Sequence, residues 1–260
     1  SLLQDVTSKK SLIYYLLIII IALLFKKKVI IFAQGIGPIG NKFLSNITAF
    51  VIKRASYVSV RDDVSLNFLK RHKINAYLCA DPVWNVKIDD KLDKKGTVVI
   101  QLREHKLVND EFLTNLAKAV SENYSNEKIY LLSLQNKLDF SVCNKLKEKI
   151  GLINNNIDVK VVENTSNEEV IEHIFSCKEI IAMRYHACLV ALKAGIKVLP
   201  INYDIKVEAL AKEFNLNYVD LNDTSGILNT VKNFANTKIT EKRELINSKQ
   251  FDFKALIEKI

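Results

Sequence analysis

The second half of the chain alternates short apolar runs with longer amphipathic segments, and this alternation is the strongest constraint on its fold. The apolar runs have the length of buried strands, and the segments between them have the length of helices. Such a series folds into a parallel sheet covered by helices, so we predict an α/β fold. The predicted strands cover 97–102, 128–134, 157–162, 178–183 and 196–201, and the predicted helices cover 110–124, 138–150, 166–176 and 186–194.

Charged and aromatic side chains follow three of these predicted strands. Open parallel sheets bind ligands beyond the carboxyl ends of their strands, so these side chains are expected at one edge of the sheet. Together they predict an anion site, whereas each one alone would be read as a solvated loop charge or a half-buried histidine. The first strand is followed by Arg103 and His105, the fourth by Arg184 and His186, and the fifth by Tyr203, Asp204 and Lys206.

The first half of the chain predicts a second, smaller α/β unit. Its first strand, 29–33, leads into the glycine-containing segment 34–40, where the backbone can approach a ligand closely. This segment lacks the full glycine spacing of a dinucleotide-binding loop or a P-loop. The polar region 87–96 separates the halves, so we predict two domains, 1–86 and 87–260. Helices are predicted at 42–55 and 63–71, strands at 57–60 and 76–80, and a turn at 81–84.

Positive charge is concentrated in the first half. Residues 1–85 contain 12 Lys and Arg against 4 Asp and Glu, a formal charge of +8, whereas residues 86–260 contain 26 against 25, or +1. No aromatic interleaving or zinc-finger spacing supports a nucleic-acid partner. An anionic membrane surface or a diphosphate-bearing substrate fits this half, and so does a basic surface that serves only solubility.

The apolar segment 12–25 is followed by three lysines, Lys26–Lys28. Its 14 residues fall short of the ~20 that a membrane-spanning helix needs, and a signal peptide would carry its positive charge before the apolar run. We therefore predict a helix packed against the N-terminal sheet. The chain begins at Ser1 and its only methionine is Met183, which suggests a fragment or a processed chain. The four cysteines show no metal-ligand spacing, so no metal site is expected.

Six short motifs occur in a fixed order through the chain, at residues 1–8, 33–38, 60–62, 80–83, 184–187 and 203–207. In this order they resemble the polysaccharide pyruvyl transferases, most closely the CsaB-type members that act on cell-wall polysaccharide. The resemblance implies two Rossmann-like domains facing a cleft, as in GT-B glycosyltransferases, with the N-terminal domain incomplete. The departures from the family pattern, at Ala182, Tyr185 and 200–202, leave Arg184 and His186 in place.

The resemblance also implies a reaction. Phosphoenolpyruvate would give its pyruvyl unit to two hydroxyls of one sugar, forming a cyclic ketal and free phosphate, with no nicotinamide, flavin or metal cofactor. The acceptor would be a lipid-linked saccharide, and the enzyme would be cytoplasmic, in peripheral contact with the inner face of the plasma membrane.

Site residues follow from the same resemblance. Planar guanidinium groups match the phosphate and the carboxylate of the donor, and a histidine near neutral pH can move a proton. Lys206 would stabilise the departing phosphate, and Asp204 would orient Lys206 or an acceptor hydroxyl. His186 is assigned the proton transfer, with His105 as its rival. The predicted donor-binding residues are Arg103, Arg184, Tyr185, Lys206 and Asp204, and the predicted acceptor-binding residues are Gln4, Asp5, Gln34, Gly35 and Arg61.

Two other functions remain open at this point. A GT-B glycosyltransferase that uses a nucleotide sugar would share the architecture. A membrane-associated remnant without catalytic activity would share the motifs.

Overall fold

The computed structural model describes residues 2–5, 8–87, 96–163, 166–238 and 243–249. They form two compact units, which we treat separately. Unit 1 contains the described residues up to Asn85 together with Ser248 and Lys249, and unit 2 is Val86–Asn247. For comparison, the sequence analysis places the boundary after residue 86 and assigns every later residue to the second domain.

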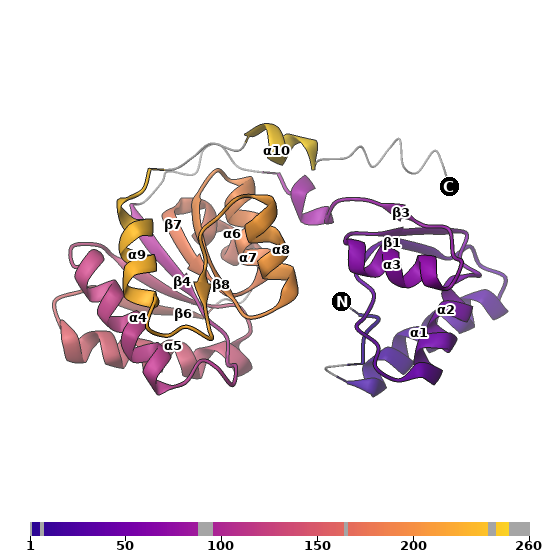
Figure 1. Ribbon diagram of the computed structural model, residues 1–260, viewed down its shortest axis with the longest axis horizontal. Helices are drawn as coiled ribbons and strands as arrows, with labels where there is room; N and C mark the ends of the chain where they lie inside the picture. Colours follow the sequence, from indigo (N-terminus) through magenta and orange to yellow (C-terminus); the bar gives the residue numbers. More distant parts are fainter. Residues whose placement is uncertain (1, 6–7, 88–95, 164–165, 239–242, 250–260) are drawn as a thin grey trace. The chain divides into compact units, whose positions relative to one another are not determined.

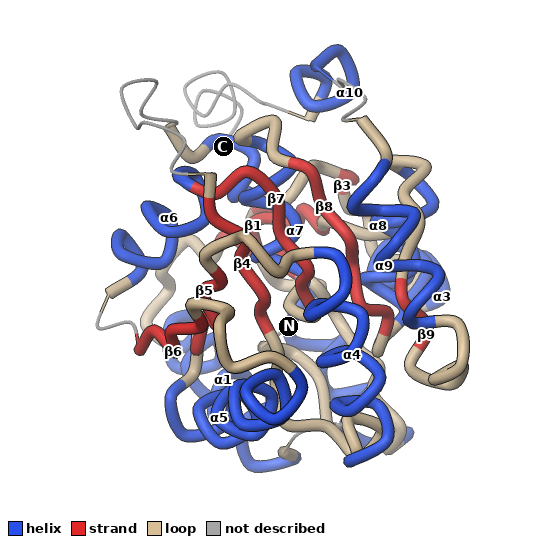
Figure 2. The backbone as a smooth tube through the Cα atoms, turned by 90° about the vertical axis from the view of Figure 1, so that its left-hand side faces the viewer, coloured by secondary structure: helices blue, strands red, loops and turns tan. Residues whose placement is uncertain are grey.

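Unit 2 is built on a six-stranded, fully parallel sheet with the order β6-β5-β4-β7-β8-β9. Numbered within the unit, this is the 3-2-1-4-5-6 order of the dinucleotide-binding fold, so the winding direction reverses between β4 and β7. Figure 2 shows β5, β4, β7 and β8 running side by side. The strands are β4 (Thr97–Gln101), β5 (Ile129–Ser133), β6 (Val159–Glu163), β7 (Cys177–Ala182), β8 (Lys197–Asn202) and β9 (Val219–Asp220).

Helices cover both faces of this sheet (Figure 1). Side chains alternate along a strand, so β4 supplies both cores: Val98 and Ile100 pack beneath α4, α5 and α9, and Val99 points to the other face. All three side chains are fully buried. The first layer is α4 (Asp110–Asn123), α5 (Asn136–Ile153) and α9 (Ile227–Asn236); the second is α6 (Asn167–Ser176), α7 (Tyr185–Lys193) and α8 (Ile205–Glu213). A short helix, α10 (Arg243–Ser248), follows them.

Unit 1 has a three-stranded parallel sheet in the order β1-β2-β3. Leu3 adds a parallel bridge to Ile36, just beyond the end of β1. The helices and this sheet share one hydrophobic core, to which Ile52, Val60 and Leu69 contribute fully buried side chains. The elements are α1 (Lys9–Leu24), β1 (Ile30–Gln34), α2 (Lys42–Ile52), β2 (Tyr57–Val60), α3 (Asp63–Arg71), β3 (Tyr77–Leu78) and a short 3₁₀ helix, η1 (Pro82–Asn85).

The apolar segment 12–25 is helical, but it is buried on one side only. The Ser8 hydroxyl caps α1 by accepting the Ser11 N–H at 3.3 Å. Leu12 and Leu16 lie in the core of unit 1, whereas the opposite side of the helix is exposed. Among the described residues, no helix combines the length and apolar character needed to cross a bilayer.

The predicted α/β class with parallel sheets is confirmed. Every element of unit 2 up to β8 lies within a few residues of its predicted position. No element was predicted after residue 201, where α8, β9, α9 and α10 follow. These last elements are short, and polar turn residues interrupt their apolar pattern.

Candidate functional site

The site of unit 2 begins where β4 and β7 end side by side. The two strands remain paired to their ends, because the Met183 N–H donates to the Gln101 carbonyl at 3.0 Å. One residue further on, the Arg184 N–H donates to the Gln101 side-chain oxygen at 2.8 Å, and the Arg103 N–H lies 3.4 Å from the Met183 sulfur. Arg103 and Arg184 therefore leave the sheet together at the reversal point, where this fold class binds its ligands.

The guanidinium of Arg184 is held by a carboxylate that the sequence analysis did not select. Its Nε donates to Asp139 Oδ2 at 3.0 Å, and its Nη2 donates to Asp139 Oδ1 at 2.6 Å. Nη2 also donates to Gln135 Oε1 at 3.0 Å. The Asp139 side chain is fully buried and that of Arg184 is 20% exposed. Arg184, which we predicted to bind the donor, thus turns the Nε and Nη2 edge of its guanidinium to Asp139, and Nη1 makes no hydrogen bond within the described residues.

Asp139 is also tied to the loop before α5. Its Oδ2 accepts the Leu134 N–H at 3.2 Å and the Gln135 N–H at 3.0 Å. With the two bonds from Arg184, the buried carboxylate is fully hydrogen-bonded. In the sequence, Asp139 is an ordinary acidic residue in the first turn of a helix, a position favoured by the helix dipole, so no local signal marks its contact with Arg184.

The guanidinium of Arg103 lies near an aromatic ring and forms no ion pair with any described residue. Its guanidinium carbon is 5.3 Å from the ring centroid of Tyr203, which follows β8. Its Nε is buried without a hydrogen-bond partner among the described residues. A buried guanidinium N–H without an acceptor is unfavourable, and an anionic ligand would supply one.

His105 contacts the same tyrosine, with ring centroids 5.9 Å apart and the rings edge to face. Its Nδ1 accepts the Leu107 N–H at 3.3 Å, which places the proton of the neutral ring on Nε2. Partial burial and then the positive charges of Arg103 and Lys106 lower the pKa of His105, against a smaller opposing effect of Asp204. Burial raises the pKa of Tyr203. Near neutral pH, His105 is therefore an uncharged donor through Nε2.

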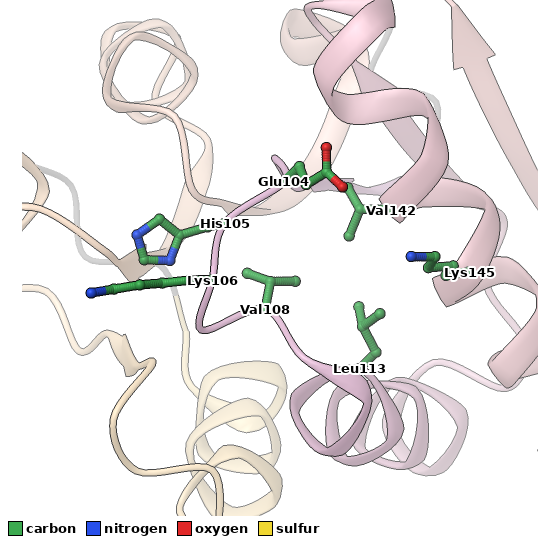
Figure 3. A pocket seen from close by; sticks show the side chains of 7 residues that line it. All are labelled: Glu104, His105, Lys106, Val108, Leu113, Val142 and Lys145. Atoms are coloured by element: carbon green, nitrogen blue, oxygen red, sulfur yellow. The ribbon is translucent and has the colours of Figure 1, made fainter. Parts of the chain in front are cut away.

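A hollow of about 390 Å³ opens beside this loop, as Figure 3 shows. His105 and Lys106 lie on one side of it and Lys145 lies on the other. Its volume falls within the range of small-ligand pockets. The lining residues are Glu104, His105, Lys106, Val108, Leu113, Val142 and Lys145.

The first turns of α7 and α8 carry the remaining predicted donor residues. Arg184 is the N-cap of α7, and its side chain makes no cap hydrogen bond, so the positive end of the helix dipole lies beside the Arg184 guanidinium. His186 is exposed in that turn, and its ring lies edge to face with Tyr185 at 5.5 Å. Asp204 caps α8: its Oδ1 accepts the N–H groups of Lys206 and Val207, each at 3.0 Å.

In unit 1, three of the five predicted acceptor residues meet at the carboxyl ends of β1 and β2. The Gln34 side-chain amide donates to the Gly35 carbonyl at 2.9 Å. Arg61 forms an ion pair with the buried Asp81. A β-carbon on Gly35 would lie 3.4 Å from Arg61 Nε, so the guanidinium lies directly beside the Gly35 backbone.

The other two, Gln4 and Asp5, precede α1. Asp5 has a structural contact: its carboxylate accepts the Gly40 and Asn41 N–H groups at 2.9 and 3.0 Å. These bonds lower the pKa of Asp5. Asp5 therefore fixes the loop between β1 and α2.

A bulge in β1 shapes this end of the sheet. The register with β2 shifts between Ile31 and Gln34, and Ala33 adopts a left-handed backbone with φ of 48°. The Ala33 N–H donates to the Ser59 hydroxyl oxygen at 2.9 Å. Bulges are frequent next to ligand sites because they re-aim the side chain that follows, here Gln34. An alanine gives no sequence signal for this conformation.

Within the described ranges, no three His, Cys, Asp or Glu side chains gather as they would around a metal ion.

A sequence profile of the family described as Polysaccharide pyruvyl transferase matches residues 1–205. The chain belongs to the polysaccharide pyruvyl transferase family. The matched region of the chain includes every predicted site residue except Lys206. No curated protein sequence matches the chain.

Solved structures with a similar fold include a UDP-GlcNAc 2-epimerase and proteins in complex with UDP. UDP-GlcNAc 2-epimerase from Methanocaldococcus jannaschii is 15% identical, with a TM-score of 0.66 over 94% of this chain and 73% of that one. Anabaena Alr3699/HepE, in complex with UDP and glucose, is 11% identical, with a TM-score of 0.60 over 95% and 74%. Staphylococcus aureus TarM is 11% identical, with a TM-score of 0.53 over 82% and 45%. At these identities the likeness concerns the fold alone.

Proposed function

We propose that this pyruvyl transferase family member transfers the pyruvyl unit of phosphoenolpyruvate to two hydroxyls of one sugar in a cell-wall or exopolysaccharide precursor, as a cyclic ketal. The observation that carries the proposal is the pair of arginines, Arg103 and Arg184, at the reversal point of the unit 2 sheet. Phosphoenolpyruvate is small and carries both a phosphate and a carboxylate. Its binding therefore needs cationic groups and hydrogen-bonding N–H groups close together.

The two arginines would contribute differently. The buried Nε of Arg103 has no hydrogen-bond partner in the part of the chain that the structure describes, and it would donate to an oxygen of phosphoenolpyruvate. Arg184 is fixed by Asp139, so only Nη1 would reach the phosphoenolpyruvate, next to the N-terminus of α7 and the positive end of its dipole. A helix N-terminus and two guanidinium groups together suit a ligand with more than one negative charge.

The reaction releases one phosphate and moves two hydroxyl protons. Carbon 3 of phosphoenolpyruvate takes up one proton, and the first hydroxyl oxygen bonds to carbon 2 as its own proton leaves. The bond between carbon 2 and the phosphate oxygen then breaks, with its electron pair departing on phosphate. The second hydroxyl oxygen bonds to carbon 2 and closes the ketal, and its proton ends on phosphate or solvent. A single group that alternately gives and takes a proton serves these steps.

We assign the proton transfer to His186. It is exposed in the first turn of α7, next to Arg184, and a histidine can carry and release a proton near neutral pH. Its rival His105 has Nδ1 engaged by the Leu107 N–H, which suits a role as a neutral hydrogen-bond donor. Lys206, half-buried in the first turn of α8, would offset the charge of the departing phosphate.

The acceptor would bind to unit 1, at the carboxyl ends of β1 and β2. Gln34, Gly35 and Arg61 gather there, with Gln4 and Asp5 on the preceding segment. We propose a lipid-linked saccharide as the acceptor and the cytoplasmic face of the membrane as the place of action. No nicotinamide, flavin, metal or nucleic acid enters the proposal.

A nucleotide-sugar glycosyltransferase is the second candidate, because the similar structures include proteins in complex with UDP. The two candidates differ in donor and product. We would incubate the chain with lipid-linked saccharides and either phosphoenolpyruvate or UDP-sugars, and measure the products by mass spectrometry and the release of phosphate. A ketal with stoichiometric phosphate supports the proposal. Sugar transfer from a UDP-sugar without any ketal would replace it. Lys118→Gln, an exposed change on α4, serves as the matched control for substitutions in the site.

A further inference from the structure

From Ile13 to Leu24, the side of α1 that faces away from the unit 1 core carries no charged residue. Leu12 and Leu16 are buried on the inner side, so apolar residues occupy both sides of the helix. A helix that is apolar all round is normally covered on all sides. We call the exposed set the α1 apolar face: Ile13, Tyr14, Leu17, Ile18, Ile21 and Leu24, whose side chains are between 43% and 75% exposed.

Lysines lie at both ends of the α1 apolar face. Lys9 and Lys10 begin the helix, Lys26–Lys28 follow it, and all five are exposed. The sequence contains no Asp or Glu between Asp5 and Asp62, so the α1 apolar face has no acidic residue on its own helix or on α2. A continuous apolar surface with a basic rim marks an interaction site rather than an ordinary solvated surface.

We propose that the α1 apolar face docks on a bilayer that contains anionic phospholipids. The helix would lie in the plane of the interface, with its apolar side chains at the boundary of headgroups and acyl chains and its lysines among the anionic headgroups. Its 16 residues would extend for about 24 Å along the surface.

Charge favours this occupant over a second copy of the chain. Two copies that paired through the α1 apolar face would bring the lysine clusters of one helix end against those of the other copy, in either a parallel or an antiparallel arrangement. Like charges would then meet at both ends of the interface. An anionic bilayer supplies an apolar layer and negative charge together.

The test is flotation of the whole chain with vesicles of phosphatidylcholine, with or without phosphatidylglycerol. We expect binding to the anionic vesicles and weak binding to the neutral ones. Leu17→Gln with Ile21→Gln, and separately Lys26→Gln with Lys27→Gln and Lys28→Gln, should each lower the partition coefficient by roughly tenfold or more.

Matched controls come from unit 2. Leu152→Gln removes an apolar side chain that is 86% exposed on α5, and Lys118→Gln with Lys147→Gln and Lys160→Gln removes three exposed lysines; binding should change less than about twofold. Circular dichroism and urea unfolding would verify that each variant is folded. The proposal is overturned if the parent does not bind anionic vesicles or if folded α1 variants bind like the parent. It also fails if sedimentation shows that the parent self-associates through α1 without lipid. No turnover is measured, so the result is separate from that of the proposed reaction.

Discussion

Asp139 on α5 and Arg184 after β7, 45 positions apart in the sequence, form a two-point ion pair whose carboxylate is fully buried. The pair connects the N-terminal turn of α5 to the N-cap of α7, the two helices that follow β5 and β7. Its consequence is that Arg184 is held in place before any ligand binds. Such preorganisation makes an arginine a better anion ligand, because its side chain does not have to be ordered on binding.

Asp139→Asn should destabilise unit 2 by about 2–4 kcal/mol, because an amide cannot accept both Arg184 N–H groups and leaves the guanidinium charge without a partner. Urea unfolding would measure the loss. Asp110→Asn is the matched control: Asp110 pairs with Lys149 at 2.7 Å but is 88% exposed, so its loss should stay below about 1 kcal/mol. Equal losses in the two variants would contradict the structural role of Asp139.

Arg103→Lys should weaken phosphoenolpyruvate binding by roughly tenfold or more while leaving stability within about 1 kcal/mol of the parent. Among the described residues the buried Nε of Arg103 has no hydrogen-bond partner, so its loss removes a ligand contact, while the lysine can keep a positive charge beside the Tyr203 ring. Isothermal titration and urea unfolding on the same samples would separate the two effects. A variant that binds the donor normally would exclude Arg103 from the donor site.

Arg184→Lys should lower both the affinity for phosphoenolpyruvate and the stability of unit 2. An ammonium can keep one bond to Asp139 but cannot also present a fixed N–H to the donor, so donor affinity should fall by about 1.5–3 kcal/mol and stability should fall as well. If the lysine variant binds phosphoenolpyruvate within about twofold of the parent, Arg184 serves only to hold Asp139 and the α5 loop.

The sequence predicted the positions of the site residues better than their contacts. Strand ends can be read from apolar runs, so Arg103 and Arg184 were assigned to the same sheet edge correctly. The partner of Arg184 could not be read in this way, because its contact with Asp139 depends on which strands are neighbours in the folded sheet. The left-handed conformation of Ala33 had no sequence signal either.

Burial was the other property that the sequence could not give. An apolar run such as 12–25 predicts a helix whose side chains are buried. Which of these side chains pack against the rest of the protein depends on the tertiary structure. The length of the segment argued against a membrane span, and no described helix is long and apolar enough to form one. The length did not reveal that Ile18 and Ile21 would remain exposed.

His105 should titrate below the ordinary histidine pKa of about 6.5, because burial and then Arg103 and Lys106 disfavour its charged form. In the unfolded chain His105 binds its proton more readily, so its contribution makes folding stability decrease as pH falls below about 6.5 and leaves it constant above. Imidazole NMR signals would measure the pKa. Arg103→Gln should raise the pKa of His105, because it removes one of the positive charges that lower it. A pKa of His105 that stays the same in Arg103→Gln would show that the two groups do not interact.

His186→Gln should bind phosphoenolpyruvate nearly as well as the parent but turn over ~10²–10⁴-fold more slowly, the usual loss when a general acid–base group is removed. Glutamine keeps a hydrogen-bonding side chain in the first turn of α7 but has no group that can take up and release a proton. His105→Gln is the informative comparison, because His105 lies in the same site with its Nδ1 already engaged by the Leu107 N–H. For His105→Gln we expect weaker binding of phosphoenolpyruvate, because the Nε2–H of His105 would donate a hydrogen bond to it. At saturating phosphoenolpyruvate, its loss in turnover should be smaller than that of His186→Gln. Donor affinity by titration and ketal formation by mass spectrometry, measured on both variants, decide between them. If His186→Gln keeps near-parental turnover while His105→Gln abolishes it, the proton transfer belongs to His105, and the first turn of α7 serves only to bind the donor.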